Sequence, residues 1–209
     1  MFLRLSSLLT LSLVACKVVA DTAQYLDDQD LDPTCPEGYY PGVTVNEAMY
    51  TVPIDVLHGV IGSFFHAEWY TLINTTNVGK DNTVGSTREA LYVGGNPFKE
   101  RLVRVFQTPS EKMLAWKSQV HNAVVNPSGN QTAYQTTYTE EHRLMSICGG
   151  TATLVNMWNV QCANDLVNVW DEWYRLRGQA LDAVITKLGA KQFKGTCPAP
   201  LPKSKSNSK

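Results

Sequence analysis

The residues best suited to chemistry lie in two predicted strands that a Gly-Gly-Asn-Pro reversal joins. Because side chains alternate along a strand, Arg88, Ala90 and Tyr92 share one face of the first strand. Glu100 opens the second. A carboxyl group in an apolar cavity loses hydration and its pKa rises, so Glu100 could act as a general acid or base, with Arg88 and Tyr92 as further catalytic candidates. The alternative is a structural salt bridge between Glu100 and Arg88 or Arg101 at the rim of the sheet.

Two tyrosines and two histidines are further polar candidates. Tyr134 and Tyr138 share a face of a later predicted strand and could donate hydrogen bonds to a ligand carbonyl. They could also pack outward as cross-strand pairs, but we expect them to point inward. His121 and His142 fall at predicted strand ends, so we expect surface or capping residues there rather than catalytic ones.

Several classes of function are disfavoured by what the sequence lacks. It has no nucleophile elbow, P-loop, His-Glu-x-x-His or dinucleotide-binding fingerprint. It has no Cys-x-x-Cys pair, and its 4 histidines are scattered without the spacing of metal ligands. We therefore expect no bound cofactor and no metal. The formal net charge is −1 and the only basic cluster is the 203–209 tail, so nucleic acid is not an expected partner.

The elements that must position these residues follow a simple order. Apolar alternation, turns and a helical hydrophobic period predict a series of strands followed by one long helix. The helix is capped by Asn164 or Asp165, runs to Gly189, and carries Trp170 and Trp173 on its buried side, where they should form core or cavity wall. The predicted strands cover residues 43–51, 70–78, 84–93, 100–107, 112–121, 131–142 and 151–161. Two short segments follow the first strand: a helix over 53–60, and a helix or turn over 63–69.

This order, together with the stretch from Gly85 to Leu102, resembles the START-like superfamily. The sequences Gly85-Ser86-Thr87-Arg88 and Glu100-Arg101-Leu102 carry the resemblance. The superfamily includes polyketide cyclases, proteins of the birch-pollen-allergen type and abscisic-acid receptors. The resemblance implies an α+β helix-grip fold, in which a curved antiparallel sheet of seven strands wraps around the long C-terminal helix. It also implies a cavity for an apolar small molecule between the sheet and the helix.

The resemblance further implies which residues face a ligand. In the abscisic-acid receptors, the positions matching Ala90, Tyr92, Glu100 and Trp116 line the pocket. The receptor's gate loop is only partly kept and its latch is not matched. A receptor for a cytosolic phosphatase also does not suit an exported chain, so we reject that specific function. The expected ligand-binding residues are Ala90, Trp116, Tyr134, Tyr138 and Trp173.

Such a cavity suits two main functions. The first is a cyclase of secondary metabolism, which would orient an apolar polyketide- or terpenoid-like intermediate for cyclisation, Diels–Alder-type cycloaddition or dehydration. Orientation and one placed donor can lower the barrier without a cofactor. The second is a secreted, non-catalytic carrier of a hydrophobic small molecule such as a sterol, fatty acid or phenolic. A weaker third option is a surface or defence protein whose cavity is incidental. Ionisable residues in the cavity favour the enzyme, whereas a purely apolar lining favours the carrier.

The chain also carries signs of export. Residues 1–20 have a basic start, an apolar stretch and small residues before a cleavage site after Ala20, which is the pattern of a signal peptide. Cys16 also fits a lipoprotein box, so a lipid-anchored form is the alternative. Asn74 and Asn130 begin sequons for N-glycosylation. We expect a protein of the secretory pathway or the extracellular space without stable membrane insertion.

The mature chain should contain a single domain. We expect residues 21–42 to form an extended N-terminal arm and residues 43–190 to form the helix-grip domain. Residues 191–209 are expected to be a tail with a disordered end.

The cysteines left after cleavage allow two disulfides. Cys148 and Cys162 are close in sequence, but the strand between them would hold them roughly 35–40 Å apart. Disulfide partners need α-carbons about 4.4–6.8 Å apart. The long helix runs back over a similar length and returns Cys197 to the end where Cys148 lies. In the helix-grip order the first strand lies beside the seventh, which brings Cys35 near Cys162. The expected disulfides are therefore Cys35–Cys162 and Cys148–Cys197.

Overall fold

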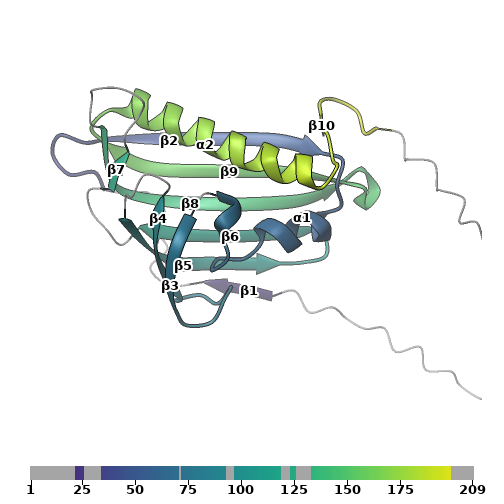
Figure 1. The fold of residues 1–209 in the computed structure, drawn as a ribbon, viewed down its shortest axis with the longest axis horizontal. Helices are drawn as coiled ribbons and strands as arrows, with labels where there is room; N and C mark the ends of the chain where they lie inside the picture. Colours follow the sequence, from purple (N-terminus) through teal and green to yellow (C-terminus); the bar gives the residue numbers. More distant parts are fainter. Residues whose placement is uncertain are drawn as a thin grey trace, which may run out of the picture.

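The computed structural model describes residues 22–25, 34–70, 72–92, 97–118, 123–125 and 133–198. Apart from short helical segments, nine strands come first along the chain, and the long helix follows them (Figure 1). The strands are β1 (Thr22–Tyr25), β2 (Tyr40–Tyr50), β3 (Leu72–Val78), β4 (Thr87–Tyr92), β5 (Pro97–Gln107), β6 (Glu111–Ser118), β7 (Ala123–Val125), β8 (Ala133–Ile147), β9 (Ala152–Ala163) and β10 (Gln192–Phe193). The helices are α1 (Ile54–Ile61) and α2 (Leu166–Lys187), with 3-10 helices η1 (Glu68–Tyr70) and η2 (Cys148–Gly150).

The described strands form one antiparallel sheet. Their order is β10-β2-β9-β8-β6-β5-β4-β3, while β1 pairs with β5 and β7 pairs with β8. The first long strand, β2, therefore pairs with the last long strand, β9, and α2 lies across one face of the sheet (Figure 1). An antiparallel sheet with a long C-terminal helix is the architecture that the sequence predicts. The strand count differs, because β1, β7 and β10 were not predicted.

The predicted extended arm over 21–42 contains a strand. β4 pairs with β5 only along residues 97–101 of β5, which leaves one edge of β5 open further along. β1 pairs with residues 104–107 there, so hydrogen-bonding groups of that edge gain backbone partners. The first long strand also begins earlier than predicted, at Tyr40 rather than at Val43.

The predicted tail over 191–209 also needs correction. Gln192–Phe193 forms β10, which pairs with the end of β2, so the described part of this segment belongs to the sheet. Tyr70, predicted to open a strand, instead ends the 3-10 helix η1. Two short helical segments do follow the first long strand, as predicted.

Several predicted features lie outside the described residues. They are the signal peptide over 1–20 with Cys16, the histidine His121, the sequon at Asn130, and residues 199–209 of the tail. Asn74 lies in β3, at a point where the pairing of β3 with β4 is interrupted between Ile73 and Thr76. Glycosylation at Asn74 and Asn130 stays a prediction.

Helix α2 begins at a hydrogen-bonded N-cap and buries one stripe of side chains against the sheet. Asp165 accepts a hydrogen bond from the backbone N–H of Asn168 at 3.1 Å, so it is the cap among the two predicted candidates. The stripe that faces the sheet consists of Val169, Trp173, Arg177, Ala180, Leu181, Val184 and Ile185. The prediction that Trp170 is buried is wrong: its side chain is 43% exposed and stacks on Tyr174. Val169 is the buried residue in this turn. Trp170, the next residue, projects about 100° further around the helix axis and so points away from the sheet.

The main apolar core lies where the C-terminal half of α2 meets α1 and the strands β8 and β9. Burial of this shared surface fixes both helices on the same face of the sheet. Its buried members are Tyr50, Val52, Ile54, Leu57, Ile61, Leu144, Val155, Met157, Leu181, Val184 and Ile185. No helix within the described ranges has the length and apolar character needed to cross a membrane.

Both expected disulfides are present. The Cα–Cα distance is 5.3 Å for Cys35–Cys162 and 5.5 Å for Cys148–Cys197. The pairing of β2 with β9 places Pro41 opposite Cys162, which explains why a cysteine just before β2 reaches the end of β9. Two disulfides are typical of a protein that folds in an oxidising compartment.

Removal of the two disulfides should lower the free energy of unfolding by different amounts. The sequence separation is 127 for Cys35–Cys162 and 49 for Cys148–Cys197. A bond that constrains the unfolded chain contributes about 2–4 kcal/mol, and the longer loop should add ~1 kcal/mol more. Urea unfolding of the paired variants Cys35→Ala/Cys162→Ala and Cys148→Ala/Cys197→Ala measures both losses. An equal or larger loss from the second pair would contradict this expectation.

Candidate active site in the sheet interior

The register of β4 and β5 places Arg88 directly opposite Glu100. Their side chains are only 2% and 1% exposed, and Arg88 Nε donates a hydrogen bond to Glu100 Oε2 at 2.6 Å. The ion pair with Arg88, one of the two predicted roles of Glu100, is therefore present. It lies in the buried interior and not at the rim of the sheet. Arg101, the other predicted partner, is exposed.

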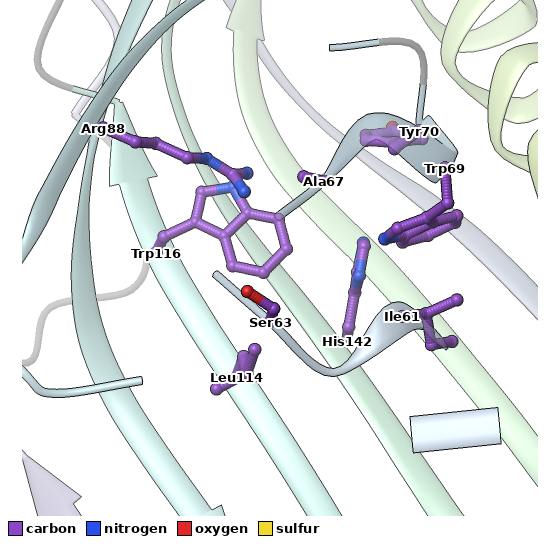
Figure 2. Close-up of a pocket in the computed structure, with 9 residues that line it drawn as sticks. All are labelled: Ile61, Ser63, Ala67, Trp69, Tyr70, Arg88, Leu114, Trp116 and His142. Atoms are coloured by element: carbon purple, nitrogen blue, oxygen red, sulfur yellow. The ribbon is translucent and has the colours of Figure 1, made fainter. Parts of the chain in front are cut away.

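Arg88 is held on several sides. Its Nη1 donates to the backbone carbonyl of Phe64 at 2.5 Å. The guanidinium carbon lies 4.5 Å from the centre of the Phe64 ring and 4.9 Å from that of the Trp116 ring, and Figure 2 shows it against the indole. Such cation–π contacts are strongest where water is excluded. The positive charge is thus fixed beside Glu100.

The second oxygen of Glu100 accepts two further hydrogen bonds. Trp116 Nε1 donates to Oε1 at 3.0 Å, and the Tyr138 hydroxyl donates to the same oxygen at 2.5 Å. Burial raises the pKa of Glu100 above its ordinary value, while the charge of Arg88 and the Tyr138 hydrogen bond oppose the rise. Burial and the nearby Glu100 raise the pKa of Tyr138 well above its ordinary value, so the phenol keeps its proton. Four predicted site residues meet here: Arg88, Glu100, Trp116 and Tyr138.

A second buried carboxylate, Glu140, lies on the same face of β8 as Tyr138. Its Oε1 accepts a hydrogen bond from Arg177 Nε at 3.0 Å and lies 2.9 Å from His142 Nε2. Asn159 Nδ2 donates to its Oε2 at 3.4 Å. Burial alone would raise the pKa of Glu140, but the charge of Arg177 and the bond with His142 outweigh it and lower the pKa to about 2. Glu140 is therefore ionised at neutral pH.

The sequence analysis does not identify Glu140 and Arg177 as site residues, although the sequence contains a signal for each. Arg177 follows Trp173 by one helical turn and precedes Ala180 on the same side of α2, so it lies on the stripe that the helical period predicts to be buried. Glu140 shares its strand face with Tyr138, which was predicted to point inward. A charged residue at a buried position of each element would have suggested an internal ion pair.

The prediction that His142 is a surface or capping residue is wrong. β8 continues well past this position, so His142 lies within the strand and its side chain is only 7% exposed. Its ring lies 4.6 Å from the Trp116 ring in an edge-on contact, and 5.7 and 5.9 Å from the rings of Trp69 and Tyr70 (Figure 2). Burial lowers the pKa of His142, while Glu140 opposes the shift.

Tyr134 does not share the inward face with Tyr138, because β8 contains an irregularity. The pairing of β8 with β9 shifts register between Gln135 and Tyr138, and an extra residue in a strand reverses the alternation of its side chains. Gln135, fully buried, therefore takes the inward position, and Tyr134 is partly exposed. Trp173, a predicted ligand contact, donates from Nε1 to Gln135 Oε1 at 2.7 Å, and Gln135 Nε2 donates to Gln161 Oε1 at 3.2 Å.

Of the two other predicted site residues on β4, Ala90 and Tyr92, only Ala90 has a described side chain. Ala90 is buried and packs with Ala67 and Phe98. Tyr92 ends β4, but its side chain lies outside the described part of the structure, so its role stays a prediction.

The space beside Arg88 is much smaller than the predicted ligand cavity. Its volume is about 10 Å³, which is about what one water molecule needs. It is lined by Ile61, Ser63, Ala67, Trp69, Tyr70, Arg88, Leu114, Trp116 and His142 (Figure 2). Larger hollows of about 300 and 320 Å³ lie beside Trp170 and beside Phe98, respectively. Among the described residues, the side chains of Arg88, Trp116, Trp173 and Arg177 are buried in this part of the interior.

The four-residue cluster around Glu100 offers a carboxyl group with a phenol donor and a fixed positive charge, each within hydrogen-bond distance of that carboxyl. Such a set can transfer a proton to a substrate oxygen and stabilise the charge that results. In the part of the chain that the structure describes, no three His, Cys, Asp or Glu side chains gather where they could hold a metal ion.

Several solved structures share the fold of this chain. A protein of Nitrosospira multiformis matches with a TM-score of 0.52 at 16% identity, over 70% of this chain and 94% of its own. The protein XoxI from Bacillus cereus matches with a TM-score of 0.53 at 12% identity, over 70% and 94% of the two chains. Norcoclaurine synthase from Thalictrum flavum matches with a TM-score of 0.49 at 13% identity, over 72% and 94%.

These likenesses are confined to structure. At such low identity the first two show the fold alone, and nothing about the chemistry of this chain follows from the third, weaker one. No family model matches the sequence, and no curated protein matches it.

The variant Glu140→Gln tests the second ion pair. At neutral pH it removes the negative charge beside the buried Arg177, and the free energy of unfolding should fall by about 3–5 kcal/mol. The pKa of Glu140 is lowered from 4.5 to about 2, so its contribution is complete above the first value and is lost as the pH falls toward the second. Denaturant unfolding at several pH values should show the gap to wild type narrowing across that interval.

The matched control is Glu89→Gln, because Glu89 is a carboxylate that is 53% exposed and pairs with Lys99 at the surface. It should change stability little at any pH. A gap between Glu140→Gln and wild type that stays constant as the solution is acidified would contradict the role given to Glu140.

Proposed function

We propose that this chain is a START-like helix-grip protein that acts, without a cofactor, as an enzyme on a small apolar molecule bearing a carbonyl or hydroxyl group. The proposed reaction is cyclisation, Diels–Alder-type cycloaddition or dehydration of a polyketide- or terpenoid-like intermediate of secondary metabolism. One observation carries the proposal: a buried carboxyl, Glu100, has a raised pKa and sits among Arg88, Trp116 and Tyr138. The two disulfides suit action in the secretory pathway or outside the cell.

Glu100 is the proposed general acid. Burial raises its pKa, so a larger share of the carboxyl stays protonated near neutral pH than for an exposed glutamate. The protonated group can donate to a substrate oxygen, and Tyr138 can supply a second donor to the same atom. Arg88 then stabilises the carboxylate that remains. Tyr92 stays a predicted catalytic residue.

The polar end of the substrate is proposed to lie beside Arg88. The space there admits about one oxygen-sized group. The apolar part of the substrate would extend toward Ala90 and Phe98, which pack against Ala67. Ala67 lines the space beside Arg88, while Ala90 and Phe98 border the open hollow of about 320 Å³. This apolar cluster therefore borders both spaces.

The second candidate function is a secreted carrier of a hydrophobic small molecule such as a sterol, fatty acid or phenolic. One observation favours it. Arg88, Trp116 and Tyr138 already bond to both oxygens of Glu100, and a purely structural buried carboxylate needs the same complete set of partners.

The variants Glu100→Gln and Tyr138→Phe separate these functions. Turnover would be measured by mass spectrometry with linear polyketide- and terpenoid-like compounds, and binding of the same compounds by calorimetry. If Glu100 is the acid, Glu100→Gln should lower kcat by about 10²–10⁴-fold and change KM much less. Tyr138→Phe should lower kcat by a smaller factor.

Glu89→Gln again serves as the control, since it removes an exposed carboxylate from β4. Wild-type protein that binds such compounds but converts none of them would refute the enzyme and support the carrier. Equal kcat values for Glu100→Gln and wild type would show that another group supplies the proton.

A further inference from the structure

A hollow of about 300 Å³ lies where the first turns of α2 pass over β2. The residues that line it are Gly42, Val43, Gln161, Leu166, Val167 and Trp170. None of these six lines the space beside Arg88. The volume is at the lower end of the range for small-molecule pockets. Since β10 pairs with β2 only at Met49 and Tyr50, β2 is the edge of the described sheet at this point.

Two contacts fix α2 to β2 on either side of Trp170. Gly42 allows the first contact, because a Cβ at that position would overlap Leu166 Cδ2. Two helical turns further along, Asn46 Nδ2 donates a hydrogen bond to the backbone carbonyl of Tyr174 at 3.1 Å. Trp170 lies about one turn from each of these contacts. The packing of α2 on β2 therefore sets the position of Trp170 beside the hollow.

Most of the wall is apolar and much of it is exposed. Val43, Val167 and Trp170 are 56%, 76% and 43% exposed. A contiguous apolar patch of this kind marks a binding surface more often than single exposed residues do. The Trp170 ring is held flat on the Tyr174 ring, with the ring centres 5.0 Å apart and the planes inclined by 10°. Among the described residues that line the hollow none is charged, so the hollow suits a neutral molecule.

One buried amide lines the hollow and has a free donor. Gln161 is only 1% exposed. The Trp173 indole N–H can only donate, so the Gln135 atom that it meets at 2.7 Å is the carbonyl oxygen. The Gln135 nitrogen therefore faces Gln161 and donates to its Oε1 at 3.2 Å. This chain of bonds leaves Gln161 Nε2 without a partner among the described residues. Nε2 is not one of their completely enclosed polar atoms, so it is reached from the hollow.

We propose that this hollow binds a small neutral molecule of one or two flat rings that carries an oxygen acceptor, such as a lactone, an aryl ketone or an aryl ether. The rings lie against Trp170 and Val167, and the oxygen accepts a hydrogen bond from Gln161 Nε2. The inference goes beyond the proposed function, since the hollow shares no residue with the Glu100 cluster and binding there requires no turnover.

Coumarin and naphthalene are matched probes, because both are flat, neutral molecules of two rings and only coumarin has a carbonyl group. Each would be titrated into the wild-type protein and followed by NMR at the Trp170 indole and the Val167 methyl groups. Both should shift these signals saturably. Coumarin should bind about 3–10-fold more tightly, which is the gain from one hydrogen bond. The Trp116 indole, beside Glu100, is the internal control and should not shift.

Three variants test the residues that form the hollow. Trp170→Ala removes the aromatic wall and should weaken the binding of both probes by about tenfold. Tyr40→Ala is its control, since Tyr40 is an aromatic residue of β2 that is 59% exposed but does not line the hollow. It should leave both affinities unchanged. Gln161→Leu, shown to be folded by circular dichroism, should bind coumarin no more tightly than naphthalene.

Three results would overturn the site. One is equal affinity of the wild-type protein for the two probes, which requires no variant to fold. Another is a shift of the Trp116 signal in place of the Trp170 signal, which would put the probe beside Glu100. The third is a Trp170 signal that moves with protein concentration and does not respond to either probe, which would show that a second copy of this chain covers the hollow.

Discussion

Two carboxylates buried on one face of a sheet impose the main physical constraint on this molecule. An ionised side chain loses several kcal/mol of hydration in a protein interior, so each needs a cation within hydrogen-bond distance. Glu100 has Arg88 at 2.6 Å, and Glu140 has Arg177 at 3.0 Å. The first arginine comes from the adjacent strand and the second from α2. The long helix is therefore held to the sheet by charge as well as by its apolar stripe.

Strand register turns these pairs into a continuous polar band across the face beneath α2. Arg88 lies opposite Glu100 in the pairing of β4 with β5. Trp116 lies opposite Glu140 on β8, and Glu140 lies opposite Asn159 on β9. A slip of one residue in any of these pairings would turn a buried charge to the other face. The register of the sheet therefore sets the geometry of the candidate site.

The order of elements could be predicted because alternation and helical period are local properties of the sequence. The contact between Arg88 and Glu100 was also predictable as one of two alternatives, since a short reversal sets the register of neighbouring strands. The position of Tyr134 was not, because the irregularity that reverses its direction depends on pairing with a distant strand. His142 was misplaced for a similar reason: where its strand ends depends on its partners. The size of the internal space depends on how large side chains such as Arg177 pack, which no local pattern records.

One face of the sheet holds two buried carboxyl groups whose pKa values are displaced in opposite directions. The direct measurement is the ¹³C chemical shift of the side-chain carboxyl carbons of Glu100 and Glu140 against pH, with assignments from Glu100→Gln and Glu140→Gln. We expect Glu100 to titrate above the ordinary glutamate pKa of 4.5 and Glu140 well below it. Titration of Glu100 at or below the ordinary value would show that burial does not raise its pKa.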